Sequence, residues 1–184
     1  LDVFGGVRRS VEAADADVDA AEEARRDVLV SLLGELARNY VDARTFQRRI
    51  ALADRNIALQ QETLDVTVSR FEAGLTSELD VAQARAQLQT RRSQVPPLRV
   101  GFAQSLHRLG VLLGREPGWL VAEFERVGPI PVVPPEVPVG VPSDVLRRRP
   151  DVRRAERRMA SASARVGVAT ADLFPKFSLT GAFG

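Results

Sequence analysis

The feature that most constrains this chain is a stretch of about 69 residues, from Gly5 to Ala73, that contains no proline. After Gly6 the only glycine in it is Gly34, so nearly every position is compatible with a helix. At a rise of ~1.5 Å per residue, such a helix would extend for about 100 Å. A helix of that length does not fit inside a globular domain of 184 residues, which predicts a coiled coil or a strut.

Apolar residues recur along this stretch in two lines, each with a seven-residue interval. The first line comprises Leu29, Leu36, Ala43, Ile50, Ile57, Leu64 and Phe71. The second comprises Leu52, Leu59 and Val66, two positions later and therefore about 200° round the helix. A heptad interval predicts a left-handed supercoil, and two opposed lines are typical of a helix with a neighbour on each side, like a stave in a barrel. Toward the N-terminus the first line weakens, because Glu22 and Asp15 occupy it.

The long helix is expected to end in a tight turn, the tip, at residues 73–77. Gly74 can adopt the αL conformation that closes a helix C-terminus. Ser77 is a favourable N-cap for the next helix, and Asp80 can complete a reciprocal capping box with it.

A shorter returning helix is predicted from about Glu78 to Leu113, with a kink or break at Pro96 and Pro97. Residues 5–114 therefore predict a mainly α fold based on a long antiparallel coiled-coil hairpin.

The rest of the chain comprises three segments of different predicted structure: a connector, two helices and a terminal strand. Residues 115–142 predict a Pro-rich connector, and the part from Glu125 to Pro142, rich in proline and valine, is expected to be extended. Within residues 143–172, Ser143 is placed to cap a short helix over Asp144–Arg148, and Pro150 to open a second helix that ends near Asp172.

Both ends of the chain read as strands. Within residues 173–184, apolar and small polar residues alternate with a period of two, which is typical of a strand. The apolar members are Phe177, Leu179, Gly181 and Phe183. Residues 1–4 could end another strand. Because the chain begins without a methionine and ends inside a strand-like run, we expect it to be part of a larger protein.

Composition argues against several classes of function. With no cysteine, a single histidine (His107) and no suitable carboxylate cluster, the sequence predicts no metal site, cofactor or enzyme activity. We expect His107, between two leucines on an apolar helical stretch, to be a packed or hydrogen-bonded structural residue. The net charge of +2, with interspersed signs, gives no reason to expect nucleic-acid binding. No apolar run approaches 18 residues, so no transmembrane helix is predicted.

Three stretches of the sequence resemble the TolC-like outer-membrane efflux factors, particularly the NodT-type lipoproteins. The stretches are Leu1–Gly5, Arg70–Ala84, and Leu146–Glu156 together with Ala171–Gly181. Their order and spacing fit the family over essentially the whole chain. The resemblance implies a trimer in the outer membrane and periplasm, in which each protomer adds strands to a membrane β-barrel and helices to a periplasmic α-barrel. This chain would supply half of an α-barrel repeat and short ends of barrel strands.

The resemblance also implies a passive exit duct that works with a periplasmic adaptor and an inner-membrane pump. By residue, Gly74, Leu75, Thr76 and Ser77 match the tip where the adaptor docks, with Leu75 and Thr76 exposed. Asp80 matches an acid that latches the closed tip to a neighbouring helix, although an acid in the first turn of a helix needs no such role. The phenylalanines of the last strand fit either a soluble core or membrane lipid, and the resemblance favours lipid. The alternative function is a periplasmic hairpin adaptor or scaffold without a channel, which the unequal helical arms disfavour.

Overall fold

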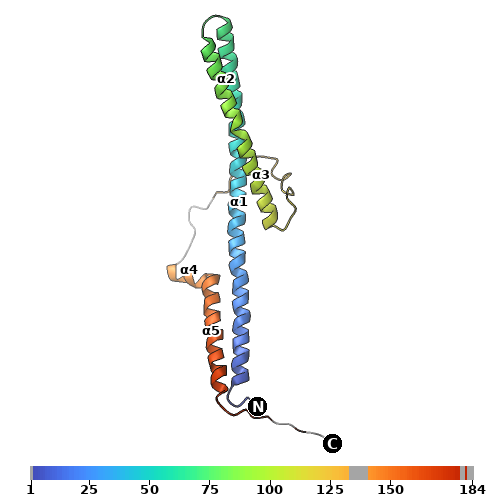
Figure 1. Ribbon diagram of the computed structural model, residues 1–184, viewed down its shortest axis with the longest axis vertical. Helices are drawn as coiled ribbons and strands as arrows, with labels where there is room; N and C mark the ends of the chain where they lie inside the picture. The colour runs from blue at the N-terminus through green and yellow to red at the C-terminus, as the bar shows by residue number, and fades with distance from the viewer. Residues whose placement is uncertain (1, 133–140, 179–180, 182–184) are drawn as a thin grey trace. The chain divides into compact units, whose positions relative to one another are not determined.

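The computed structural model describes residues 2–132, 141–178 and 181, and most of them are helical (Figure 1). The helices are α1 (Gly6–Glu72), α2 (Glu78–Ser93), α3 (Val95–Leu112), α4 (Pro142–Arg148) and α5 (Pro150–Ala171). The predicted continuous long helix is confirmed, since α1 is one helix of 67 residues. No helix among the described residues is long and apolar enough to cross a membrane.

The chain folds as two compact units, and each takes a part of α1. The first unit comprises Leu1–Leu32 and Pro134–Gly184, and the second comprises Leu33–Val133. The predicted division into barrel strands, hairpin, connector and second repeat stays a prediction.

In the second unit, the first heptad line of α1 supplies two separate apolar clusters. The distal cluster, near the tip, joins Leu64 to α2 through Val81, Ala84 and Leu88, with Ile57 and Val68 packed against it. The proximal cluster joins Ala43 to α3 through Leu106 and Leu109, with Leu36, Tyr40 and Phe102 packed against it. These contacts confirm that the first line packs on the returning arm at Leu36, Ala43, Ile57 and Leu64. Leu29 and Phe71, the two ends of the line, stay 48% and 43% exposed.

The second heptad line of α1 is exposed. Leu52, Leu59 and Val66 keep 59%, 60% and 60% of their surface accessible. Burying apolar surface stabilises a protein by about 25 cal/mol per Å², so a continuous exposed line of this kind favours a partner.

The returning arm is broken between α2 and α3, as the two prolines predict. The break lies at Gln94, whose amide N–H donates to the carbonyls of Arg91 and Arg92. Pro96 and Pro97 lie in the first turn of α3. Prolines are tolerated there because first-turn amides have no intrahelical acceptor.

Part of the predicted connector packs on the hairpin. Residues 117–124 form turns, and Leu120 and Phe124 are buried in the proximal cluster. The guanidinium carbon of Arg44, on α1, lies 4.0 Å from the Phe124 ring centroid. Nη1 of Arg44 donates to the Arg126 carbonyl at 3.3 Å. Gln47 donates to the carbonyls of Phe124 and Arg126. Together Arg44 and Gln47 form a clamp that satisfies main-chain carbonyls in a segment without regular structure.

The first unit pairs the beginning of α1 with α5 through small residues. The buried positions are Ala13, Ala16 and Ala20 on α1 and Ser161 and Ala164 on α5. A Cβ on Gly6 would lie 3.3 Å from the Ala171 Cβ, so the helices approach closely there.

Four ion pairs cross between α1 and α5. They join Asp17 to Arg165, Asp19 to Arg157, Glu23 to Arg153 and Asp27 to Arg154. Glu23 differs from the other three acids because its side chain is only 6% exposed. Its Oε1 accepts from both Arg26 and Arg153, at 2.6 and 3.0 Å.

Three expectations need correction. Ser143 does not cap α4, because that helix begins at Pro142, with Val141 at the N-cap position and no side-chain cap. His107 is exposed on α3 and not packed, since the neighbouring leucines alone face the core. Residues 2–4 and 175–178 are not strands in the described part of the chain, so the barrel segments 1–4 and 173–184 stay predictions. Leu179 and Phe183 lie outside the described residues.

Candidate functional site

The tip begins with the glycine that ends α1. Gly74 has φ of +72°, a conformation that side-chain-bearing residues rarely adopt. Its N–H donates to the Phe71 carbonyl at 2.8 Å, and the Leu75 N–H donates to the Arg70 carbonyl at 2.8 Å. This pair of bonds is the Schellman motif, and it satisfies carbonyls that the end of α1 would otherwise leave unpaired.

The predicted capping box at the start of α2 is confirmed. Ser77 is the N-cap; its hydroxyl accepts from the Asp80 N–H, and the Asp80 carboxylate accepts from the Ser77 N–H at 3.0 Å. The same oxygen, Oδ2, also accepts from the hydroxyls of Thr76 and Ser77, at 2.5 and 2.6 Å. These bonds to the ionised form, from Ser77 and then from Thr76, lower the pKa of Asp80 to about 2.

Asp80 therefore carries its charge at neutral pH while acting as a cap. All three contacts to its carboxylate fall on Oδ2, so Oδ1 makes no hydrogen bond within the described chain. A donor from outside could reach Oδ1 without breaking the cap. The latch that the resemblance implies is thus compatible with this geometry and remains a prediction.

Leu75 and Thr76 have different environments, contrary to the expectation that both are exposed. Leu75 is 74% exposed and makes no contribution to either apolar cluster. Thr76 is half-buried, with its hydroxyl committed to Asp80. Only Leu75 has the freedom expected of a docking side chain.

An open groove of about 360 Å³ runs beside Leu75 along the last turns of α1. Its other lining residues are Asp65, Val66, Ser69, Arg70 and Ala73. Val66 belongs to the exposed second heptad line, so the groove joins that line to the tip. The arrangement offers apolar surface bordered by one charge of each sign, Asp65 and Arg70, which suits another protein's helix.

Sequence reasoning missed the clamp of Arg44 and Gln47. No motif marks it, because its acceptors are carbonyls 77 to 82 residues away. The paired acids on α1 lie two and four positions apart, whereas the paired arginines on α5 follow no regular interval, so the sequence gives only a weak signal for these ion pairs. Just before α5, Arg149 pairs locally with Asp151 at 2.7 Å.

Comparison with known proteins gives one consistent result. The family model for outer membrane efflux proteins matches residues 1–115. Nodulation protein T of Rhizobium leguminosarum bv. trifolii is 38% identical over 178 residues, which is 97% of this chain and 38% of the relative. The solvent efflux pump outer membrane protein SrpC of Pseudomonas putida is 35% identical over 185 residues, covering all of this chain and 39% of the relative.

The same holds for solved structures. The structure of the outer-membrane channel OprN superposes with a TM-score of 0.86 and 41% identity, over 95% of this chain and 39% of that one. The chain thus spans about two fifths of the length of the proteins it matches.

Proposed function

Because this chain belongs to the outer membrane efflux protein family, we propose that it forms the helical-hairpin part of a channel protomer. In the complete assembly, three protomers form a passive exit duct through the outer membrane and periplasm. The duct receives substrate from an inner-membrane pump through a periplasmic adaptor. Neither the hairpin nor the duct carries out a chemical reaction.

The observation that carries this proposal is the exposed heptad line on α1. The first heptad line, from Leu36 to Leu64, already packs on α2 and α3. Leu52, Leu59 and Val66 therefore offer a second seam to a helix from outside the chain. A helix packed on two opposite sides is what a barrel of helices requires, whereas an isolated hairpin requires only one. This favours the channel over the hairpin adaptor that lacks a channel.

The tip supplies the second part of the proposal. Leu75 projects from a turn that Gly74 and Asp80 hold rigid, beside an apolar groove. We assign docking of the adaptor to Leu75 and the groove. Thr76 and Ser77 act through the capping network, and Asp80 combines capping with the latch.

The test uses the full-length protein in a strain that lacks its outer-membrane exit channel. We expect Leu75→Asp to abolish drug resistance and cross-linking to the adaptor, because docking would desolvate the new charge. Trimer assembly and membrane insertion should be unchanged. Leu75→Met keeps the volume and the apolar surface, and it should keep resistance.

Two results would overturn the proposal. Normal resistance with normal cross-linking in Leu75→Asp would leave the tip as a helical turn only. Recovery of the full-length protein from the periplasm as a water-soluble hairpin would favour the adaptor.

A further inference from the structure

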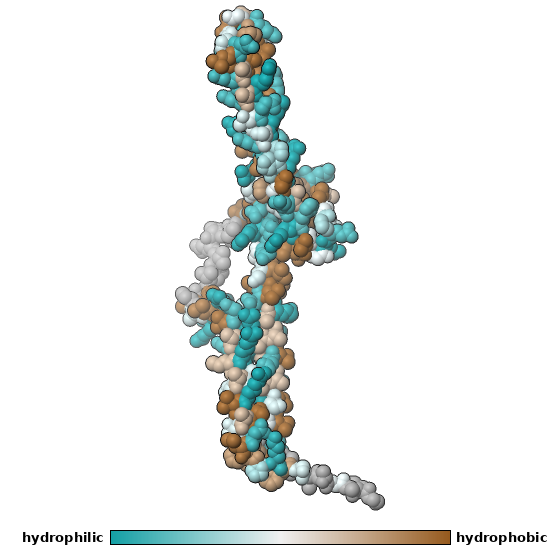
Figure 2. Space-filling view, in the orientation of Figure 1, coloured by the Kyte–Doolittle hydropathy of each residue, from teal (hydrophilic) through white to brown (hydrophobic). Residues whose placement is uncertain are grey.

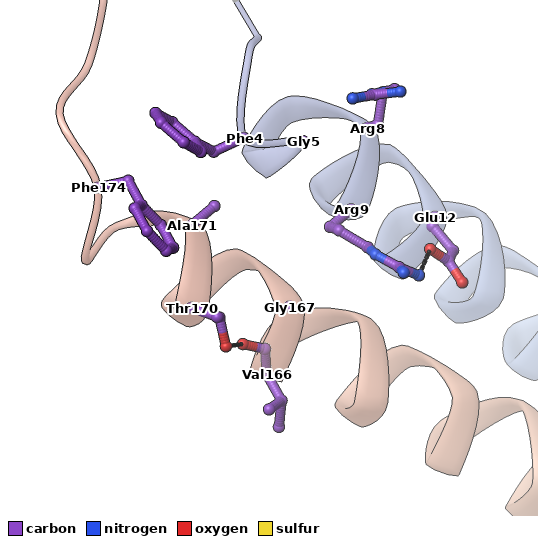
Figure 3. A pocket seen from close by; sticks show the side chains of 10 residues that line it. All are labelled: Phe4, Gly5, Arg8, Arg9, Glu12, Val166, Gly167, Thr170, Ala171 and Phe174. Atoms are coloured by element: carbon purple, nitrogen blue, oxygen red, sulfur yellow. Dashed lines mark hydrogen bonds and ion pairs between the residues drawn. The ribbon is translucent and has the colours of Figure 1, made fainter.

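A second pocket, unrelated to the tip, lies in the first unit where α1 begins and α5 ends (Figure 3). We call it the terminal pocket, and it has a volume of about 560 Å³. One wall is aromatic: the rings of Phe4 and Phe174 stack with centroids 4.6 Å apart. The other wall is charged, and it carries Arg8, Arg9 and Glu12.

The surroundings of the aromatic wall are apolar and open to solvent. Phe4 and Phe174 remain 43% and 46% exposed in spite of their stacking. Val7, Val166 and Leu173 beside them are exposed more fully. Figure 2 shows hydrophobic side chains gathered at this end of the α1–α5 pair. Soluble surfaces rarely expose so many large apolar groups together.

The charged wall has hydrogen-bond donors to spare. The Arg8 side chain bonds Asp2 through Nε, at 3.3 Å, and no hydrogen bond within the described chain uses its two terminal nitrogens. Arg9 contacts Glu12 through Nη1, at 2.7 Å. Asp2 also accepts from the backbone N–H groups of Val7 and Arg8, which lower the pKa of its carboxyl. Each arginine is thus paired with one acid and keeps further guanidinium N–H groups, and guanidinium forks suit phosphate oxygens.

Gly167 places Arg9 in this wall. A Cβ on Gly167 would lie 3.1 Å from both Cδ and Cγ of Arg9. The absence of a side chain there lets the arginine stem lie across α5. The position of the Arg9 guanidinium therefore depends on the absence of a side chain at Gly167.

We propose that the terminal pocket binds a membrane phospholipid. The phosphate lies against the guanidinium groups of Arg8 and Arg9, and an acyl chain lies over Phe4 and Phe174. A free phosphate ion would use only the charged wall, whereas a lipid uses both walls. Aromatic and basic side chains side by side are typical of the membrane–water interface. The inference rests on the proposed channel, since that function brings this end of the unit to a membrane.

The test is a lipid titration of the full-length protein, purified in detergent and followed by native mass spectrometry. The probe is dioleoylphosphatidylglycerol. We expect the double variant Arg8→Gln/Arg9→Gln to bind the lipid roughly tenfold or more weakly, because it loses charge-assisted hydrogen bonds. The matched control, Arg147→Gln/Arg158→Gln, removes the same charge from exposed positions outside the pocket and should bind normally.

A second variant guards against misfolding of the first. Gly167→Ala keeps every charge and displaces the Arg9 stem, so it should also weaken lipid binding. Unchanged binding in both variants would overturn the proposal. Equal retention of glycerol 3-phosphate, which has the headgroup phosphate without acyl chains, would overturn it as well.

The outcome is separable from that of the proposed function. Selective lipid loss in these variants supports the pocket even if the wild-type protein confers no resistance, in which case only the channel function fails. Full resistance together with unchanged lipid binding in every variant would reject the pocket and leave the channel standing.

Discussion

At the residue scale, the capping groups of the tip were predictable and the clamp was not. Gly74, Ser77 and Asp80 interact within seven positions of one another, so local rules of helix termination identify them. Arg44 and Gln47 act on carbonyls that only the folded chain brings near. The prediction that Thr76 is exposed was wrong, because its hydroxyl donates to the Asp80 carboxylate. The prediction treated Thr76 as a docking residue and did not consider this local acceptor.

The pKa of Asp80 predicts how the tip responds to acid. The pKa is lowered from 3.8 to about 2 in the folded state, so the native state binds fewer protons than the unfolded state between these values. The resulting stabilisation is present above pH ~4 and is lost as pH falls toward about 2. We expect the melting temperature of the hairpin to decline over this window, and Asp80→Asn to remove that part of the decline. Glu78→Gln, in the same turn, is the control and should leave it in place.

Gly74 gives a second prediction, since its φ of +72° strains any residue with a branched side chain. Nothing lies within 4 Å of the added Cβ, so strain and not a clash sets the cost. We expect Gly74→Val to lower the free energy of unfolding by roughly 1–2 kcal/mol or more, as measured by urea denaturation. Gly74→Asn should cost less, because asparagine tolerates this conformation. Equal losses in the two variants would show that φ is not the cause.

The clamp of Arg44 and Gln47 can be tested with the only tryptophan in the chain, Trp119. Trp119 lies in residues 117–126, the segment that the clamp holds, which we call the clamped segment. Gln47→Leu leaves the carbonyls of Phe124 and Arg126 without this donor and should cost about 1–3 kcal/mol. Trp119 fluorescence should then report detachment at a lower urea concentration. Gln61→Leu, which removes only exposed hydrogen bonds, is the matched control and should leave the transition unchanged.

At the element scale, heptad periodicity predicted the long helix and its first packing face, and the prolines predicted where the returning arm breaks. It did not predict α5 as the partner of the beginning of α1. The reason is physical: that interface is made of alanines and charges, and the hydrophobic signal is weak where side chains are small. The strands at the two ends stay predictions, since a strand is completed by hydrogen bonds from a neighbouring strand.

The ion pairs between α1 and α5 should contribute unequally. Glu23 is buried, with its Oε2 lacking any hydrogen bond within the described chain, whereas Asp19 is half exposed and 3.7 Å from Arg157. We expect Glu23→Ala to destabilise the pairing by about 1–3 kcal/mol, and Asp19→Ala by less than ~1 kcal/mol. Hydrogen exchange of the α5 amides measures both. Equal effects would mean that burial of Glu23 is irrelevant.

At the scale of the whole molecule, the TolC-like, NodT-type resemblance is confirmed by the family model and by relatives of both kinds. The exposed heptad line of Leu52, Leu59 and Val66 is, in addition, the surface that we propose for assembly. The second line needs a partner of its own, because two lines about 200° apart cannot both face one helix.

That surface predicts the behaviour of the chain in solution. We expect the isolated chain to self-associate, and the triple variant Leu52→Gln/Leu59→Gln/Val66→Gln to sediment as a monomer with unchanged helicity. In contrast, Ile57→Gln on the first line should lower helical stability, because Ile57 packs against the distal cluster. Analytical ultracentrifugation and circular dichroism separate the two effects. A wild-type monomer would contradict the assignment of the second line.

The break at Gln94 divides the returning arm into two helices that pack on α1 through separate apolar clusters. On one side α2 packs on α1 through the distal cluster and the hydrogen bond from Arg92 to Gln61. On the other side α3 shares the proximal cluster with Leu120 and Phe124. Because α2 and α3 are separate helices, no continuous series of backbone hydrogen bonds connects them, and loss of the distal contacts need not disturb α3. The last turns at the tip can therefore open and close as a local event while the clamped half stays folded. The pair of prolines at the start of α3 thus leaves the tip end of α1 able to move without unfolding the rest of the hairpin.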